Sequence, residues 1–223
     1  MYESSPKMCI SLTDPRVQYL RHHDPLLSRV IDLIGDISCN IHDNSEQFII
    51  ETIVGQMLSN KAAGKINDRM RKLCCGEPTA AAIRHLSREQ LRGVGISYQK
   101  ADYIKNFSNF MEAKPHFFAL LKEMDDEDVI STLTSLKGVG KWTAKMYLLF
   151  VLQRENIVPY EDGAFMQAFK WVYGTANTNE VLAIANNWTP YSSIAARFLY
   201  RVLDYGYTKY ESLEKAENER RGC

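Results

Sequence analysis

The sequence has no net charge and no long hydrophobic run. Its 223 residues include 27 lysines and arginines and 27 aspartates and glutamates, so the formal charge is zero. This excludes a protein that holds nucleic acid mainly through a positive field, but it does not exclude local contacts. The longest unbroken apolar run, Met146 to Leu152, has seven residues. A membrane helix needs about 20, so we expect no membrane partner.

Cysteine is scarce and shows no metal-binding pattern. The five cysteines include no C-x-x-C pair, and Cys74 and Cys75 are adjacent. The spacing of a four-cysteine zinc or iron–sulfur site is absent, so we expect no iron–sulfur cluster. An odd number of cysteines suits a reducing compartment. No basic segment followed by an apolar stretch begins the chain, so we expect a cytoplasmic protein, nucleoid-associated if bacterial.

Glycine and proline are sparse, at 12 and 7 residues, and no long stretch alternates apolar and polar side chains. Apolar residues recur every three to four positions instead, which is typical of helices joined by short loops. The apolar content of 45% argues against disorder, and the length suits one large or two small domains. The pattern predicts an all-α fold with helices over residues 24–34, 45–58, 60–73, 80–85, 88–91, 100–110, 117–121, 125–133, 142–152, 162–173, 178–186 and 192–205.

One segment between two predicted helices carries more information than the rest. It runs Leu-Lys-Gly-Val-Gly-Lys-Trp-Thr-Ala from Leu136 to Ala144. Two glycines separated by one apolar residue permit a tight turn with positive φ. They also let a phosphate oxygen reach the backbone N–H groups that begin the second helix. The pattern predicts a helix-hairpin-helix turn that grips DNA phosphate, although the glycine pair alone fits a plain helix corner equally well.

Gly93-Val94-Gly95 is a second pair of this kind, but no Lys-Trp-Thr-Ala follows it. A structural corner is at least as good an interpretation there.

A carboxylate follows the hairpin. Asp162 lies twenty residues after Trp142, at the start of an apolar helix. An N-cap, worth about 1 kcal/mol, is the simpler interpretation from the local sequence. A catalytic role is compatible with it, because a capping aspartate is held rigidly and aimed out of the helix end.

With the hairpin and this carboxylate, the sequence resembles the helix-hairpin-helix (HhH-GPD) DNA glycosylases, and among them the AlkA-type 3-methyladenine DNA glycosylases. The matching blocks follow the family's order and spacing between residues 24 and 206. They are residues 53–63, 91–97, 100–104, 136–144, 159–162 and 188–195.

The resemblance implies a base-excision repair enzyme that flips a damaged base out of double-stranded DNA and hydrolyses its N-glycosidic bond. Its catalytic aspartate falls on Asp162, with Glu161 as the neighbouring rival. Bond cleavage builds positive charge on the sugar, which a fixed carboxylate stabilises. Glycosylases with lyase activity carry a Schiff-base lysine where this chain has Trp142. Lys141 stands one residue before that position and would point elsewhere. A monofunctional enzyme for alkylated purines such as 3-methyladenine is therefore implied.

An aromatic pocket that stacks on the flipped, electron-poor base is also implied. Trp142 and Tyr200 fall on pocket positions, and Tyr160 and Tyr147 are weaker candidates. For each of these aromatics taken alone, core packing is the more frequent role. Trp188 is assigned mainly to the core.

Further residues are assigned to DNA by the resemblance. Met57 is expected to fill the hole left by the flipped base, although burial in the core fits the sequence equally well. Gln56 and Ser59 are expected to contact the opposite strand or the backbone. The expected hairpin contacts are Lys137, Gly138, Val139, Gly140, Lys141 and Thr143, with the Val139 side chain bracing the turn from inside.

Hairpin carbonyls in this superfamily bind a monovalent cation that touches a DNA phosphate. The corresponding residues are Thr134, Leu136 and Gly138. A structural Na⁺ or K⁺ there is the only cofactor that the resemblance implies.

We expect two helical lobes with DNA across the cleft between them and a monomeric protein. Residues 46–136 would form one lobe, and residues 137–223 the hairpin lobe on which residues 1–45 pack. Those first residues indicate helix, so the N-terminal β domain of longer members is expected to be missing. The chain departs from the family at Ser192, often arginine there, and at Lys137, usually proline there. These departures bear on the substrate range more than on the reaction.

The zero net charge then reflects a cancellation. Five basic residues against one aspartate give +4 over residues 59–72, and residues 125–128 are all acidic. We therefore expect a shallow salt dependence of DNA binding. Two other functions stay open: a glycosylase for oxidised or mismatched bases, with lyase action by Lys141, and a non-catalytic helix-hairpin-helix DNA-binding protein.

Overall fold

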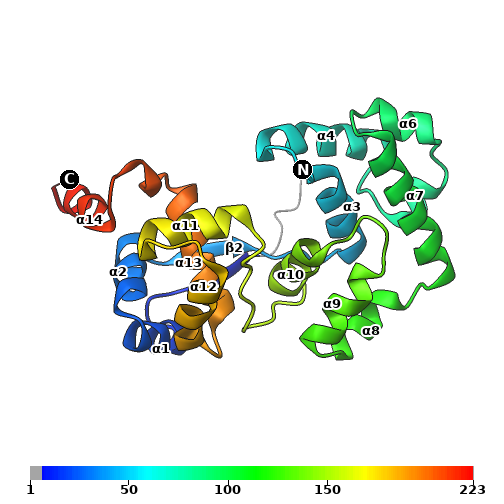
Figure 1. The fold of residues 1–223 in the computed structure, drawn as a ribbon. Coiled ribbons are helices and arrows are strands. Elements are labelled where there is room, and N and C mark those ends of the chain that lie inside the picture. Colours follow the sequence, from blue (N-terminus) through cyan, green and yellow to red (C-terminus); the bar gives the residue numbers. More distant parts are fainter. Residues whose placement is uncertain (1–6, 223) are drawn as a thin grey trace. The chain divides into compact units, whose positions relative to one another are not determined.

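Contacts divide the chain into two units. Unit 1 comprises residues 1–41 and 153–223, and unit 2 comprises residues 42–152. The computed structural model describes residues 7–222 (Figure 1). The mainly helical fold predicted from the sequence is confirmed. Within the described residues, no helix is both long and apolar enough to cross a membrane.

The elements of unit 1 come from both ends of the chain. They are β1 (Lys7–Ile10), α1 (Pro15–His23), α2 (Pro25–Ile34), β2 (Ile37–Asn40), α11 (Gly163–Tyr173), α12 (Thr178–Ala185), the 3₁₀ helix η1 (Asn186–Trp188), α13 (Ser192–Asp204), the 3₁₀ helix η2 (Tyr207–Lys209) and α14 (Leu213–Gly222). The elements of unit 2 are α3 (Ser45–Gly55), α4 (Asn60–Leu73), α5 (Ala80–Arg84), α6 (Arg88–Gly93), α7 (Tyr98–Ala113), α8 (Phe117–Glu123), α9 (Asp126–Thr134) and α10 (Lys141–Phe150).

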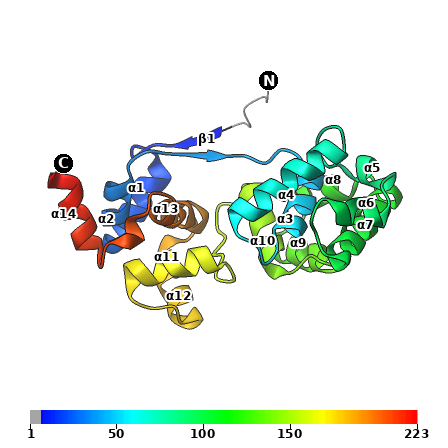
Figure 2. The same cartoon turned by 90° about the horizontal axis from the view of Figure 1, so that it is seen from above.

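The N-terminal segment differs from the helical expectation because it contains two strands. β1 and β2 pair antiparallel, from Lys7 opposite Asn40 to Ile10 opposite Ile37 (Figure 2). Ile37 and Cys39 are buried while the alternate residues of β2 are exposed. Four residues give too short an alternation for the period of a strand to be recognised in the sequence.

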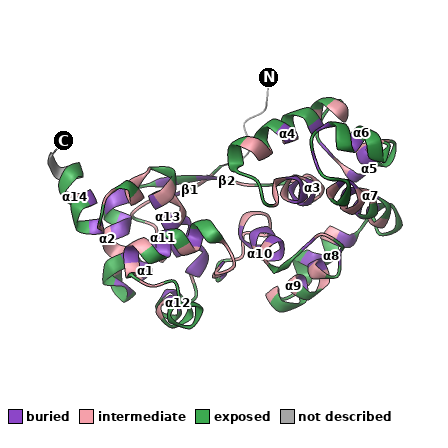
Figure 3. Ribbon diagram, turned by 45° about the horizontal axis from the view of Figure 1, so that its top comes forward, coloured by how far each residue is buried: buried purple, intermediate pink, exposed green. Residues whose placement is uncertain are grey.

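The unit boundary also differs from the one expected. The hairpin and α10 were expected with residues 153–223, but they belong to unit 2. The reason is packing, since α10 lies against α9 and α3. α3 and α10 are the most buried helices of unit 2 (Figure 3).

The core of unit 1 is built where α13 meets α2 and α11. Asp24, 5% exposed, caps α2 and accepts backbone N–H groups from Leu26 and Leu27. Its second carboxylate oxygen accepts the Tyr173 hydroxyl at 2.7 Å and Trp188 Nε1 at 2.8 Å. Burial, followed by the nearby Asp24 charge, raises the pKa of Tyr173. The core role expected for Trp188 is confirmed, because its side chain is fully buried.

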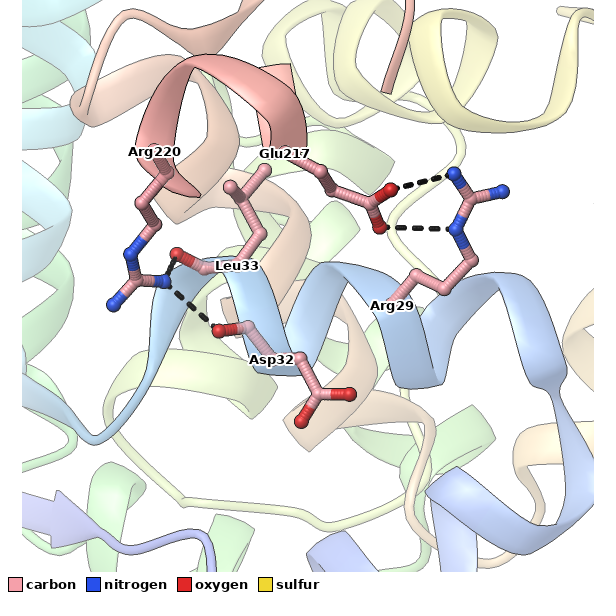
Figure 4. Close-up of a pocket in the computed structure, with 5 residues that line it drawn as sticks. All are labelled: Arg29, Asp32, Leu33, Glu217 and Arg220. Carbon is pink, nitrogen blue, oxygen red and sulfur yellow. Dashed lines mark hydrogen bonds and ion pairs between the residues drawn. The ribbon is translucent and has the colours of Figure 1, made fainter. Parts of the chain in front are cut away.

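The C-terminal helix α14 is held on α2 by charged contacts. Arg29 Nε and Nη2 donate to Glu217 at 2.9 and 2.7 Å. Arg220 Nη1 donates to the carbonyl oxygens of Asp32 and Leu33 at the end of α2 (Figure 4). The pocket between these residues is therefore lined by groups that bind one another, which makes it part of the α2–α14 seam.

Candidate active site and nucleic-acid interface

The glycine-rich segment after α9 forms a tight turn. The Val139 N–H donates to the Leu136 carbonyl at 3.1 Å, and Gly138 adopts φ +88°. Val139 is 5% exposed, so it braces the turn from inside as expected. Gly140 caps α10 without any side-chain hydrogen bond. The first turn of α10 therefore has no side-chain cap, which is the arrangement that binds an anion.

The turn is covered on one side by α7. A Cβ atom on Gly138 would lie 2.5 Å from Tyr103 Cδ2, so only glycine fits beneath this ring. Gln56 Nε2 donates to the Gly138 carbonyl at 2.7 Å. Gln56 was assigned to DNA from the sequence, and the structure shows that its side-chain amide binds the hairpin. Lys137, Gly140 and Lys141 are exposed on the turn.

Met57 lies directly after the C-cap of α3. It is 101% exposed and has φ +58°. The interpretation of Met57 as a core residue is therefore wrong. Ser59, two residues further on, is exposed and caps α4 by accepting the Ala62 N–H at 3.3 Å. A large apolar side chain thus projects into solvent from a short turn between two helices.

Two expectations on α10 need correction. Tyr147, a candidate for the base pocket, is fully buried, and its ring lies 5.7 Å from Phe118 and 6.0 Å from Phe48. Its hydroxyl lies 2.9 Å from Ser45 Oγ, and burial raises its pKa. Thr143 is 1% exposed, so its side chain does not present a surface to DNA. Both residues lie on the buried side of α10, four positions apart. Trp142, on another side, is half-buried.

Asp162 in unit 1 is the N-cap of α11, as the local sequence indicates. Its Oδ1 accepts the Phe165 N–H at 2.8 Å, and its own N–H donates to the Pro159 carbonyl at 2.9 Å. The first hydrogen bond holds the carboxylate at the positive end of the helix, and the second fixes the backbone that carries it.

Tyr200 of α13 is brought to this carboxylate. Its hydroxyl is hydrogen-bonded to Asp162, and its ring lies edge-on to Phe165 at 6.4 Å. Burial, followed by the Asp162 charge, raises the pKa of Tyr200, so the hydroxyl remains a donor at neutral pH. The sequence indicated a ring that stacks on a base, but it gave no sign of this hydroxyl contact. Tyr160, in the preceding loop, is half-buried against the core of unit 1.

Arg197 was not singled out in the sequence. It is 4% exposed within α13, and its Nη2 donates to Gln153 Oε1 at 3.0 Å. Burial lowers its pKa. An arginine inside the apolar run from Ile194 to Leu199 was the available signal, since such a residue is rarely buried without partners.

The metal ligands predicted from the sequence are backbone oxygens. In the part of the chain from residue 7 to 222, no three His, Cys, Asp or Glu side chains gather in a way that could hold a metal ion. Among the predicted carbonyl ligands, that of Leu136 accepts the Val139 N–H and that of Gly138 accepts Gln56. Each carbonyl oxygen has a second lone pair, so these contacts leave room for a cation.

The hairpin and the capping aspartate define a helix-hairpin-helix DNA-repair protein. The chain belongs to the HhH-GPD superfamily of base excision DNA repair proteins, whose family model matches residues 50–190. That range includes the Met57 turn, the hairpin and Asp162.

Known proteins resemble the chain over nearly its whole length. DNA-3-methyladenine glycosylase 1 of Schizosaccharomyces pombe is 27% identical over 220 residues, covering 93% of this chain and 95% of that protein. The crystal structure of a DNA-3-methyladenine glycosidase from Bacillus halodurans has a TM-score of 0.79 at 28% identity, covering 93% of this chain and 97% of that one. A 3-methyladenine DNA glycosylase of S. pombe in complex with abasic DNA shares the fold, with a TM-score of 0.70 at 24% identity, covering 83% of this chain and 96% of that one.

Proposed function

We propose that the protein is a monofunctional DNA glycosylase of the DNA-3-methyladenine glycosylase II type, which removes alkylated purines from double-stranded DNA and leaves an abasic site. The observation that carries the proposal is the Asp162 carboxylate, fixed at the N-cap of α11 and hydrogen-bonded by Tyr200. The names of the relatives support the substrate class. The protein acts as a monomer on one damaged base at a time.

Asp162 stabilises the positive charge that develops on the sugar as the base departs. It also orients the attacking water and accepts its proton. The Phe165 N–H and the Tyr200 hydroxyl hold the carboxylate, which keeps its orientation fixed during the reaction. An alkylated purine is already cationic and leaves readily, so little general-acid assistance is needed. Tyr160 and the ring of Tyr200 contribute to the pocket.

The groups that hold DNA come from unit 2. The uncapped start of α10, with Lys137 and Lys141 beside it, binds a backbone phosphate. A monovalent cation on the carbonyls of Thr134, Leu136 and Gly138 would add positive charge to the same contact. Met57 enters the duplex as the base leaves it. Trp142 stands where a lyase would carry its lysine, so the reaction is hydrolysis without an imine.

The experiment is a comparison of Asp162→Asn with Glu161→Gln on duplexes carrying 3-methyladenine. Each variant removes one negative charge, at neighbouring positions. We expect Asp162→Asn to lower the rate of abasic-site formation by about 10²-fold or more while duplex binding persists. Normal turnover by Asp162→Asn would overturn the mechanism, and a loss confined to Glu161→Gln would move the catalytic role to Glu161.

Borohydride treatment during turnover tests the monofunctional assignment. We expect no covalent enzyme–DNA adduct. An adduct that disappears in Lys141→Met would instead establish lyase chemistry at Lys141.

A further inference from the structure

Met57 is held in a costly conformation. Its φ of +58° lies in the left-handed region, and its side chain is wholly exposed. The left-handed conformation costs a residue with a side chain about 1–2 kcal/mol. Solvent contact of an apolar side chain offsets none of this cost, so the surrounding structure has to hold the turn.

The contacts that hold it come from Lys100 on α7. Lys100 Nζ donates to the Val54 carbonyl at 2.8 Å and to the Gln56 carbonyl at 2.6 Å. Both oxygens belong to the end of α3, where the helix leaves carbonyls without partners and its dipole is negative. A half-buried ammonium group thus fixes the backbone on the N-terminal side of Met57.

The same two elements reach the hairpin. Gln56, whose carbonyl Lys100 binds, donates its side-chain amide to the Gly138 carbonyl at 2.7 Å. Tyr103, three residues after Lys100 and on the same side of α7, covers Gly138. Lys100, Gln56 and Gly138 therefore form one hydrogen-bonded chain between the Met57 turn and the phosphate-binding turn.

We propose that Lys100 is a positioning residue that fixes Met57 relative to the hairpin before DNA binds. The inference rests on the proposed function, because it assumes that Met57 enters the duplex. A wedge already held in its working conformation loses less conformational freedom on binding, so more of the contact energy is left for base flipping. Loss of the Lys100 ammonium group should therefore impair flipping more than binding.

The chain offers a matched control at Lys105, five residues further along α7. Lys105 Nζ donates to the carbonyls of Arg84 and Leu86, each at 2.9 Å, and so closes the end of α5 in the same way. Lys100→Met and Lys105→Met each remove one ammonium group and two contacts to carbonyls. Thermal melting of the two variants measures how much stability each substitution removes.

The readout is the fluorescence of 2-aminopurine placed beside a 3-methyladenine analogue in a duplex, with abasic-site formation measured in parallel. We expect Lys100→Met to lower the flipping signal at saturating duplex by about tenfold, which corresponds to about 1.4 kcal/mol. Lys105→Met should stay within about twofold of the wild-type signal. Lys100→Arg, which can donate to both carbonyls, should recover most of it.

Equal flipping by Lys100→Met and Lys105→Met would overturn the proposal. If Lys100→Met does not fold, Gln56→Leu carries the test, because it removes only the link to Gly138. Wild-type flipping by Gln56→Leu would then overturn it. A wild-type protein that neither flips nor excises would instead mean that the proposed function itself is wrong.

Discussion

The two Gly-Val-Gly turns of unit 2 differ in how the next helix begins. After Gly138-Val139-Gly140, the N-cap of α10 is Gly140, which offers no side-chain hydrogen bond. After Gly93-Val94-Gly95, the N-cap of α7 is Ser97, whose Oγ accepts the Lys100 N–H at 3.2 Å. A helix start already satisfied by its own side chain has less to offer a phosphate. The same three residues thus precede a helix start without a side-chain cap in one place and a capped helix start in the other.

The turns also differ in what lies against their glycines. Gly138, at φ +88°, lies under the rigid Tyr103 ring. Gly95, at φ +108°, faces the end of the flexible Arg69 side chain, 3.0 Å from the place of a Cβ atom. The first turn is therefore locked between two helices, whereas the second can yield. Four sets of substitutions test this difference between the turns.

The largest effect is expected from adding a methyl group to each turn. Gly138→Ala adds a clash with Tyr103 to the cost of positive φ, and we expect it to lower the free energy of unfolding by about 3 kcal/mol and to abolish duplex binding. Gly95→Ala meets a movable group and should cost about 1 kcal/mol with binding retained. Urea denaturation measures the free energy of unfolding of each variant, and duplex titration measures its affinity for DNA. Equal losses in the two variants would remove the contrast.

The next effect concerns the missing cap. A Cβ atom on Gly140 meets nothing within 4 Å, and its φ of −99° suits any residue. Gly140→Ser therefore gives α10 the kind of cap that α7 has. We expect duplex affinity to fall about tenfold, because the hydroxyl occupies N–H groups that a phosphate would use. Gly140→Ala, with a Cβ atom but no cap, is the control and should keep more of the affinity.

The charged residues beside the hairpin should have a smaller effect. Removing Lys137 or Lys141 by substitution with Met should lower the slope of log affinity against log salt by about 0.9 for each lost phosphate contact. Arg92→Met, beside the other turn, should leave the slope unchanged. Salt titrations of duplex binding compare the three variants. If the slope fell most in Arg92→Met, the phosphate contact would belong to the turn at residues 93–95 and not to the hairpin.

The smallest effect is expected from uncapping α7. Ser97→Gly should lower the free energy of unfolding by about 0.3 kcal/mol, since glycine is a tolerable N-cap. Duplex affinity and excision should remain at wild-type values. A gain in affinity would show that the second turn also binds DNA once its cap is removed.

Local sequence signals predicted much of this molecule. Cap and glycine signals placed the ends of α2 and α11, and Asp162 is the N-cap that its position indicated. At the start of α3, however, both Asn44 and Ser45 are suitable caps in the sequence, and the structure uses Asn44, while the Ser45 hydroxyl lies 2.9 Å from the Tyr147 hydroxyl. Where two adjacent polar residues can both cap a helix, only their tertiary contacts determine which of them does so.

Features that depend on contacts between distant parts of the chain could not be predicted from the sequence. α10 is apolar on most sides, so its sequence could not show that Thr143 and Tyr147 face inward. Met57 fitted a core and a surface position equally well in the sequence, and in the structure its side chain lies in solvent after the end of α3. The contacts of Lys100 span more than 40 positions of the chain. No local periodicity or motif in the sequence predicts such contacts.

The most direct test of the hairpin's role is the dependence of the single-turnover excision rate on duplex concentration, measured for Gly140→Ser and Ser97→Gly. We predict that the half-saturating concentration rises about tenfold in Gly140→Ser, with the plateau rate unchanged, and that Ser97→Gly matches the wild type. An equal shift in both variants, or a wild-type curve for Gly140→Ser, would contradict the claim that the uncapped start of α10 holds the DNA backbone.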